Sequence, residues 1–135
     1  MIEINNLTTV KIDKEFFKEI TEKVLEGEKK KEANLSIALV GQGRIRELNK
    51  RYRGKNRITD VLAFPNKEIG LGETVICLRE VKKNAKRFSS TFEKELARVL
   101  IHGILHLLGY DHEKSEAQAK KMEEKQNYYL KLFFK

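Results

Sequence analysis

Apolar and polar residues follow one another along the chain in patterns that predict four short strands. Ile2 and Ile4 alternate with polar residues, as in a strand with one buried face. Leu35 to Val40 is a run of small and apolar residues, which is typical of a strand buried on both faces. Two further apolar runs, Val61 to Phe64 and Thr74 to Leu78, predict the remaining strands.

Apolar residues spaced three or four positions apart predict the helices. We expect them at about residues 14–26, 44–53, 81–86, 92–108 and 115–133. Asp13 and Ser115 are candidate N-caps, and Ser90 forms a capping-box pattern with Glu93. The pattern of strands and helices predicts an α/β fold over residues 1–135, with a small mixed four-stranded sheet flanked by helices.

Length and charge restrict this prediction to one basic domain. The 135 residues, 40% of them hydrophobic, suffice for one modest core and exclude two full domains. A net charge of +8 favours polyanionic partners. The single cysteine, Cys77, excludes an internal disulfide framework, and we find neither a signal segment nor a membrane span. We therefore expect a cytoplasmic protein.

All three histidines of the chain lie within residues 102–112. His102 and His106 are four residues apart, so on a helix they present two imidazoles on one face. Gly109 can adopt the left-handed conformation that ends a helix and would return His112 toward the other two. Three nitrogen ligands leave one position of a tetrahedral zinc ion open, which is the arrangement of catalytic sites. The alternative is a set of histidines that satisfy hydrogen bonds in a core helix.

The residue directly after His102 bears on the type of reaction. Zinc proteases with two histidines four apart carry a glutamate directly after the first one, as the general base. In this chain Gly103 stands at that position. Zinc-assisted hydrolysis remains possible without that base, and cleavage of a phosphodiester suits such a site better than cleavage of a peptide.

A cluster of positive charge lies upstream of the histidines. Seven basic residues and one acidic residue fall between Arg44 and Arg57. Arg46, Lys50 and Arg53 form one stripe of the predicted helix, away from its apolar face at Ile45, Leu48 and Tyr52. Alone, this stripe would be read as a solvated helix face. Beside a metal site, it favours the binding of phosphates, because arginine can hold two phosphate oxygens at once.

These residues resemble the YbeY family of bacterial metal-dependent endoribonucleases. Residues 102–112 are similar to the family pattern His-Gly-x-Leu-His-Leu-x-Gly-Tyr-Asp-His without a departure. Residues 48–55, 59–65 and 72–77 are similar to further blocks of the family. Four positions differ from the usual residues of the family: Asn56, Ile58, Ala63 and Glu73.

The resemblance implies a zincin-like metal helix in which His102, His106 and His112 hold one zinc ion. It also implies that Arg53 occupies the position of the family's functional arginine. We therefore expect Arg53 and His102 to be catalytic, and from the basic segment we expect Arg46, Lys50, Arg53 and Arg57 to bind RNA. The expected substrate is single-stranded RNA, and the expected role is maturation of the 3′ end of 16S ribosomal RNA and ribosome quality control on the small subunit. The ion would activate a water or polarise a phosphate oxygen, and Arg53 would stabilise the developing charge.

Two other functions remain open at this point. A zinc-dependent protease or amidohydrolase would share the three ligands, but it needs a base that Gly103 does not supply. A non-catalytic ribosome-binding module with a structural zinc would need a fourth protein ligand.

Overall fold

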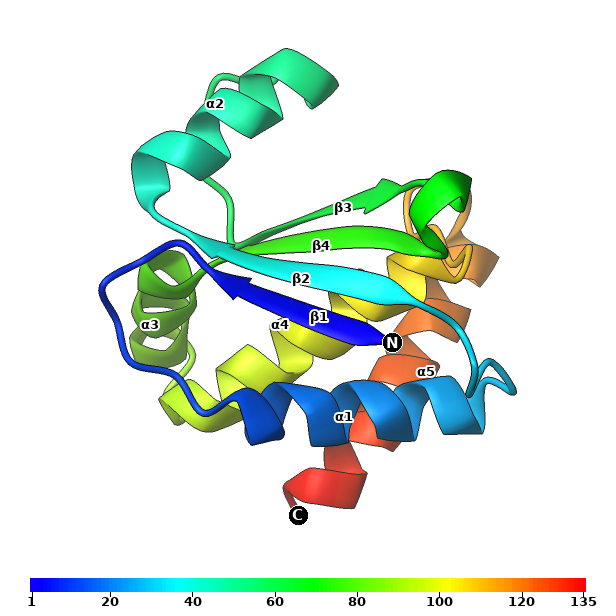
Figure 1. Ribbon diagram of the computed structural model, residues 1–135. Helices are drawn as coiled ribbons and strands as arrows, with labels where there is room; N and C mark the ends of the chain where they lie inside the picture. The colour runs from blue at the N-terminus through cyan, green and yellow to red at the C-terminus, as the bar shows by residue number, and fades with distance from the viewer.

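The computed structural model, which describes residues 1–135, is a four-stranded sheet with helices on both faces (Figure 1). The strands are β1 (Ile2–Asn6), β2 (Leu35–Val40), β3 (Val61–Pro65) and β4 (Gly72–Cys77). Their order across the sheet is β1-β2-β4-β3. β1, β2 and β4 are parallel, and β3 is antiparallel to β4. The predicted mixed sheet of an α/β fold is therefore confirmed.

The helices follow the predicted order. They are α1 (Lys14–Gly27), α2 (Gln42–Arg53), α3 (Leu78–Arg87), α4 (Phe92–Leu107) and α5 (Glu116–Phe133), with a 3-10 turn η1 (Lys67–Ile69) between β3 and β4. The predicted caps of α1 and α5 are confirmed, because the Asp13 side chain accepts a hydrogen bond from the Glu15 amide and Ser115 accepts one from the Gln118 amide. None of the helices combines the length and the hydropathy needed to cross a bilayer.

Two predictions around α3 are wrong in detail. β4 ends at Cys77, and Leu78 begins a helix of 10 residues where only one or two turns were expected. The helix is longer because Leu78, Val81 and Ala85 form a buried face along it. The N-cap of α4 is Thr91, whose side chain accepts from the Lys94 amide, and not Ser90. Ser90 still belongs to the end of α3, since its backbone amide donates to the Ala85 carbonyl.

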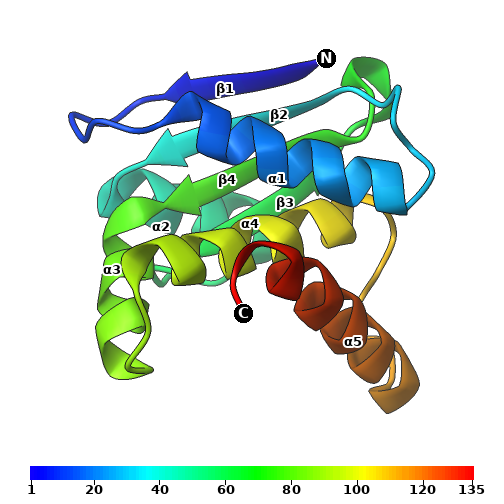
Figure 2. The same cartoon turned by 90° about the horizontal axis from the view of Figure 1, so that it is seen from below.

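Most of the core lies between the sheet and the helices on one face. Seen from below, α1 and α4 run under the strands and α5 lies beneath α4 (Figure 2). As predicted, α4 is apolar on nearly every face and is buried along most of its length. The end of this helix that carries the histidines is thus held rigidly against both the sheet and α5.

The opposite face of the sheet is covered only by α2. Ile45 is fully buried there against a small apolar cluster with Val40, Leu62 and Val75. Farther along the helix, Tyr52 is 61% exposed, although its spacing placed it in the apolar stripe. The reason is that α2 rises away from the sheet toward its C-terminus (Figure 1). Tyr52 still packs edge-to-face with the Phe64 ring.

Candidate metal centre and basic cleft

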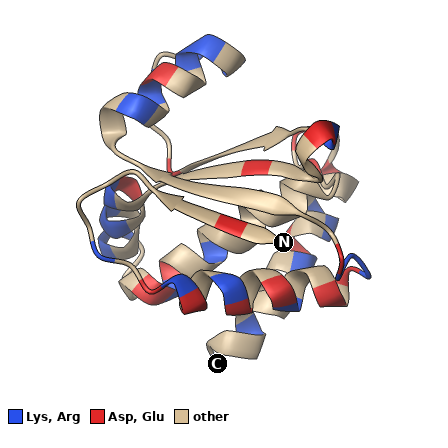
Figure 3. Ribbon diagram, viewed as in Figure 1, with Lys and Arg blue, Asp and Glu red and all other residues tan.

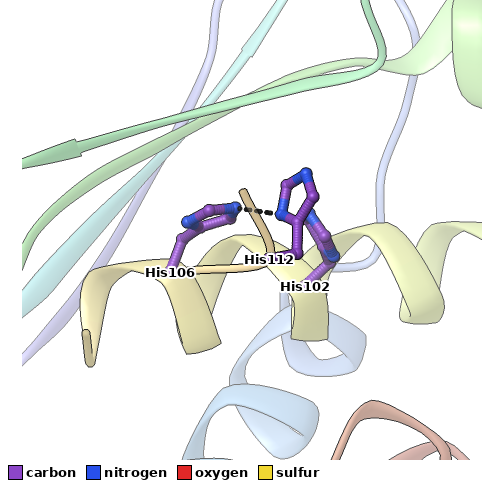
Figure 4. Close-up of side chains that lie close together, drawn as sticks. All are labelled: His102, His106 and His112. Carbon is purple, nitrogen blue, oxygen red and sulfur yellow. Dashed lines mark hydrogen bonds between the residues drawn. The ribbon is translucent and has the colours of Figure 1, made fainter. Parts of the chain in front are cut away.

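The three histidines meet where α4 ends and the chain turns back. His102 and His106 lie one turn apart on α4, and the turn after the helix brings His112 to them (Figure 4). The turn depends on Gly109, whose φ of +104° is in the region that favours glycine. One ring nitrogen from each histidine lies within 4.8 Å of the others. The predicted assembly of the three imidazoles is therefore present.

The spacing of these nitrogens fits a metal ion. His106 Nε2 lies 3.1 Å from His112 Nδ1. Two nitrogen ligands of a tetrahedral zinc ion lie about 3.3 Å apart when each zinc–nitrogen bond is about 2.0–2.1 Å. The cluster contains no fourth His, Cys, Asp or Glu. The histidines are thus positioned to bind a metal ion with room for a further ligand.

Burial favours the neutral form of both helix histidines. Burial, followed by the neighbouring His102 and His112, lowers the pKa of His106 to about 4. Burial lowers the pKa of His102 too, against the opposing effect of its hydrogen bond to Gln126. Because a metal ion binds the neutral imidazole, both shifts favour metal binding.

The histidines form one wall of an open cleft of about 230 Å³. Its other walls come from the start of β3, from the turn after His112 and from the C-terminal end of α2. Gly54, with a φ of +69°, ends α2 and turns the chain toward the cleft. Asn49 is buried and fixes this turn, since its side-chain amide donates to the Arg57 carbonyl and its own carbonyl accepts from the Lys55 amide.

The four predicted RNA-binding residues divide into two pairs. Arg53 and Arg57 line the cleft together with the three histidines. Arg46 and Lys50 are exposed on α2 but lie outside the cleft, and Arg46 Nε donates to Asn56 Oδ1. Basic side chains recur along the whole of α2 (Figure 3). The cleft therefore opens next to a surface that is rich in positive charge.

Acidic residues modulate this charge. Arg53 Nη2 lies 3.4 Å from Glu113 Oε1, and both side chains are partly exposed. Asp60 also lines the cleft; its carboxylate accepts a hydrogen bond from Asn84 and lies 3.9 Å from the guanidinium of Arg98. Reasoning from the sequence missed Glu113. The available signal was its position directly after a candidate metal ligand.

Gln126 is a second residue that the sequence did not suggest. Its Oε1 lies 2.9 Å from Nδ1 of His102, and the residue is only 9% exposed. The signal was a polar residue within the apolar stripe of α5, four positions after Met122 and three before Tyr129, both of which are buried.

Gly103 has a steric reason to be glycine. A Cβ at this position would lie 2.4 Å from Thr74 Cγ2 and 3.2 Å from Val61 Cγ2, so α4 packs on the sheet at this point. A glutamate, the residue with which zinc proteases deprotonate water, has no room there without a shift of the helix. The structure thus gives a physical reason against the protease alternative.

Comparison with known proteins agrees with this arrangement. Residues 3–133 match the family model described as Endoribonuclease YbeY. The chain is 48% identical over 119 residues to the Endoribonuclease YbeY of Thermotoga neapolitana, which covers 87% of this chain and 80% of that protein. The corresponding protein of Sulfurihydrogenibium sp. is 48% identical over 117 residues, 82% of this chain and 77% of the relative.

The fold has a counterpart among solved structures. The solution structure of TM1509 from Thermotoga maritima superposes with a TM-score of 0.70 at 41% identity, covering 96% of this chain and 87% of that one. The family match spans the histidine turn, the cleft and both ends of the chain. By sequence and by fold, this chain belongs to the YbeY family of endoribonucleases.

Proposed function

We propose that residues 1–135 form one metallo-endoribonuclease domain that cuts single-stranded RNA with one zinc ion per chain. The observation that carries this proposal is the meeting, in one cleft, of three metal-competent histidines with Arg53 and Arg57. The family relation favours ribosomal RNA as the substrate, with the 3′ end of 16S RNA on the small subunit as the site of action in the cytoplasm.

The roles of the residues follow from their chemistry. His102, His106 and His112 would hold the ion, which when bound supplies the Lewis acidity to lower the pKa of a water or to polarise a phosphate oxygen. Arg53 donates hydrogen bonds to the scissile phosphate and stabilises its extra negative charge in the transition state. His102, as ligand, and Arg53, on the phosphate, are the catalytic residues of this proposal.

The remaining basic residues guide the strand. Arg57 contacts the phosphate next to the cleaved one, inside the cleft. Arg46 and Lys50 attract the strand along the exposed face of α2. Because contacts to phosphate carry no sequence information, this surface positions RNA without selecting bases.

The two alternative functions, a zinc protease and a non-catalytic zinc module, have less support. The protease lacks its base, since Gly103 faces Thr74 at a distance that excludes a side chain. A structural zinc module requires a closed ligand set, whereas three histidines form this one.

The test is cleavage of an end-labelled single-stranded RNA, and of its duplex, by the zinc-loaded protein and by the chelated protein. We expect cleavage of the single strand by the zinc-loaded protein alone. His106→Ala should lose zinc and activity together, because one of three ligands is gone. Arg53→Ala should keep zinc and lose about 10²- to 10³-fold in kcat.

Arg51→Ala is the matched control for Arg53→Ala. Arg51 lies on the same helix and is exposed, but it is outside the cleft. Its removal changes the net charge equally and should leave kcat within about twofold. Equal losses in the two variants would overturn the role of Arg53, and cleavage that resists chelation would overturn the role of the metal.

A further inference from the structure

Gln126 lies behind the metal site, on a helix that contributes no candidate ligand. It reaches from α5 to Nδ1 of His102, while one ring nitrogen of each of the three histidines lies within 4.8 Å of the others (Figure 4). Its side chain is more than nine-tenths buried between the two packed helices. A buried amide at this place needs a hydrogen-bond partner, and Nδ1 of His102 is the partner that the structure provides.

A neutral histidine carries its single proton on one of its two ring nitrogens. If the proton is on Nε2, the ring cannot offer this atom to a metal; if it is on Nδ1, Nε2 is free. Gln126 places Oε1, which can only accept, against Nδ1 of His102. This contact is satisfied only by the tautomer with the proton on Nδ1.

We propose that Gln126 is a positioning residue that fixes His102 in the Nδ1–H tautomer and in the ring orientation that offers Nε2 to the metal ion. This inference rests on the proposed metal site and adds to it a residue from a different helix. Acceptors behind metal-bound histidines commonly contribute about 10- to 100-fold to metal affinity.

The choice of an amide also affects the charge of the site. A glutamine carries no charge, so at this position it leaves the full charge of a divalent ion available to an RNA phosphate. A carboxylate at the same position would make His102 a more basic ligand, but it would cancel part of that charge. Gln126 therefore orients the ligand without weakening the attraction for a polyanion.

The first test needs no substitution. Long-range ¹H–¹⁵N spectra of the metal-free, full-length protein at pH 8 report the tautomer of each histidine. We expect His102 to be the Nδ1–H tautomer in the wild-type protein. A His102 that carries its proton on Nε2 would overturn the proposal.

The second test compares two substitutions of similar size. Gln126→Met keeps the volume and removes the acceptor, so His102 should become a mixture of tautomers and the Kd for zinc, measured by competition with a chelating dye, should rise about 10- to 100-fold. Gln126→Glu restores an acceptor, so the Nδ1–H tautomer should return. Its Kd for zinc should be no higher than that of the wild type.

Asn127→Ala is the control, since it removes an exposed amide from the adjacent position of α5. It should change neither the tautomer nor the Kd for zinc. An unchanged Kd and an unchanged tautomer in Gln126→Met would overturn this inference while leaving the proposed nuclease intact. A wild-type protein that binds no zinc would instead overturn the proposed function itself.

Discussion

At the scale of single residues, Gly103 shows how packing and chemistry constrain one position. The residue lies on α4 between two candidate ligands, and its missing side chain lets the helix approach Thr74 and Val61 on the sheet. Thr74 is fully buried, so its side chain has no free space to move into. The close contact sets the height of the histidines above the sheet.

We expect Gly103→Ala to destabilise the protein. Alanine is favoured over glycine in a helix by about 1 kcal/mol, but a Cβ 2.4 Å from Thr74 Cγ2 overpacks the contact, at a cost of about 1–3 kcal/mol. The net loss of stability, measured by urea unfolding, should therefore reach up to about 2 kcal/mol. Gly43→Ala, in α2 with open space around it, is the control and should be neutral or stabilising.

A second substitution isolates the cause. Thr74→Ser removes the Cγ2 methyl group that the new Cβ would meet. The double variant should therefore lose less stability than the sum of the two single variants. Additive losses would show that the contact does not limit position 103.

At the scale of elements, an ion pair between α2 and the histidine turn limits how much positive charge the cleft offers to RNA. Arg53 at the end of α2 is held 3.4 Å from Glu113, which follows His112 in the turn. The pair is partly exposed, so its strength is modest, about 0.2–1 kcal/mol. An RNA phosphate must draw the guanidinium away from this carboxylate before it can bind.

Glu113→Gln should therefore strengthen the binding of RNA. The expected decrease in Kd is about twofold to fivefold, which corresponds to the strength of the lost ion pair. The measurement is fluorescence anisotropy with a 2′-O-methyl single strand, which is not cleaved. Glu116→Gln on α5 changes the net charge equally but lies outside the cleft, so it should have a smaller effect. Equal effects would attribute the gain to net charge alone.

A partly buried carboxylate at the end of α1 joins this helix to the histidine turn and to α5. Glu28, at the end of α1, accepts hydrogen bonds from Tyr110 in the histidine turn and from Tyr129 on α5, and it pairs with Lys125 at 3.3 Å. Burial opposes the charged form of Glu28, but the two hydroxyls and the ammonium prevail and lower its pKa. Burial, followed by the hydrogen bond to Glu28 and the charge of that carboxylate, raises the pKa of Tyr110 to about 12.

Acid should weaken the contacts of Glu28 with Tyr110, Tyr129 and Lys125, here called the Glu28 junction. Because the pKa of Glu28 is lower in the folded state, its contribution to stability is complete above the unfolded pKa of about 4.3 and is lost as the pH falls through the folded pKa. Glu28→Gln should cost about 1–3 kcal/mol at pH 7 and should reduce the loss of stability on acidification below pH ~5. Urea unfolding over a pH series measures both.

Glu26→Gln serves as the comparison for Glu28→Gln. Glu26 belongs to the same last turn of α1, but its side chain is exposed and makes no hydrogen bond or ion pair. Its substitution should leave stability within about 0.5 kcal/mol at every pH. An equally large effect at this position would show that the Glu28 junction is unimportant.

At the scale of the whole molecule, the net positive charge favours RNA, but only part of the basic surface borders the cleft. The net charge is +8, and α2 carries a basic stretch along its exposed side (Figure 3). RNA affinity should decrease linearly with the logarithm of salt concentration, with a slope of about −0.7 for each phosphate neutralised. The slope thus counts the contacts that the bound strand makes.

Arg57→Ala should reduce the magnitude of this slope by about 0.7, because one phosphate contact in the cleft is lost. Lys131→Ala, an equal change of charge on α5, should leave the slope unchanged. Titrations of the same 2′-O-methyl strand at several salt concentrations give both values. A similar decrease in both variants would mean that the strand binds by net charge and not in the cleft.

The sequence by itself determined the features that depend on near neighbours. The pair His102 and His106 follows from the pitch of a helix, and the return of His112 follows from the backbone freedom of Gly109. The strands, the helices and the caps at Asp13 and Ser115 were predicted for the same reason. Thr91 replaced Ser90 as a cap because the end of α3 competes for Ser90.

Only the tertiary structure decided which residues from other elements contact the histidines, Arg53 and Gly103. The sheet order β1-β2-β4-β3 and the approach of α2 to the end of α4 bring Arg53 beside Glu113, 60 positions away. The packing of α5 on α4 brings Gln126 behind His102, and the packing of α4 on the sheet excludes a side chain at Gly103. Such contacts join residues distant in sequence, so local periodicity carries no information about them.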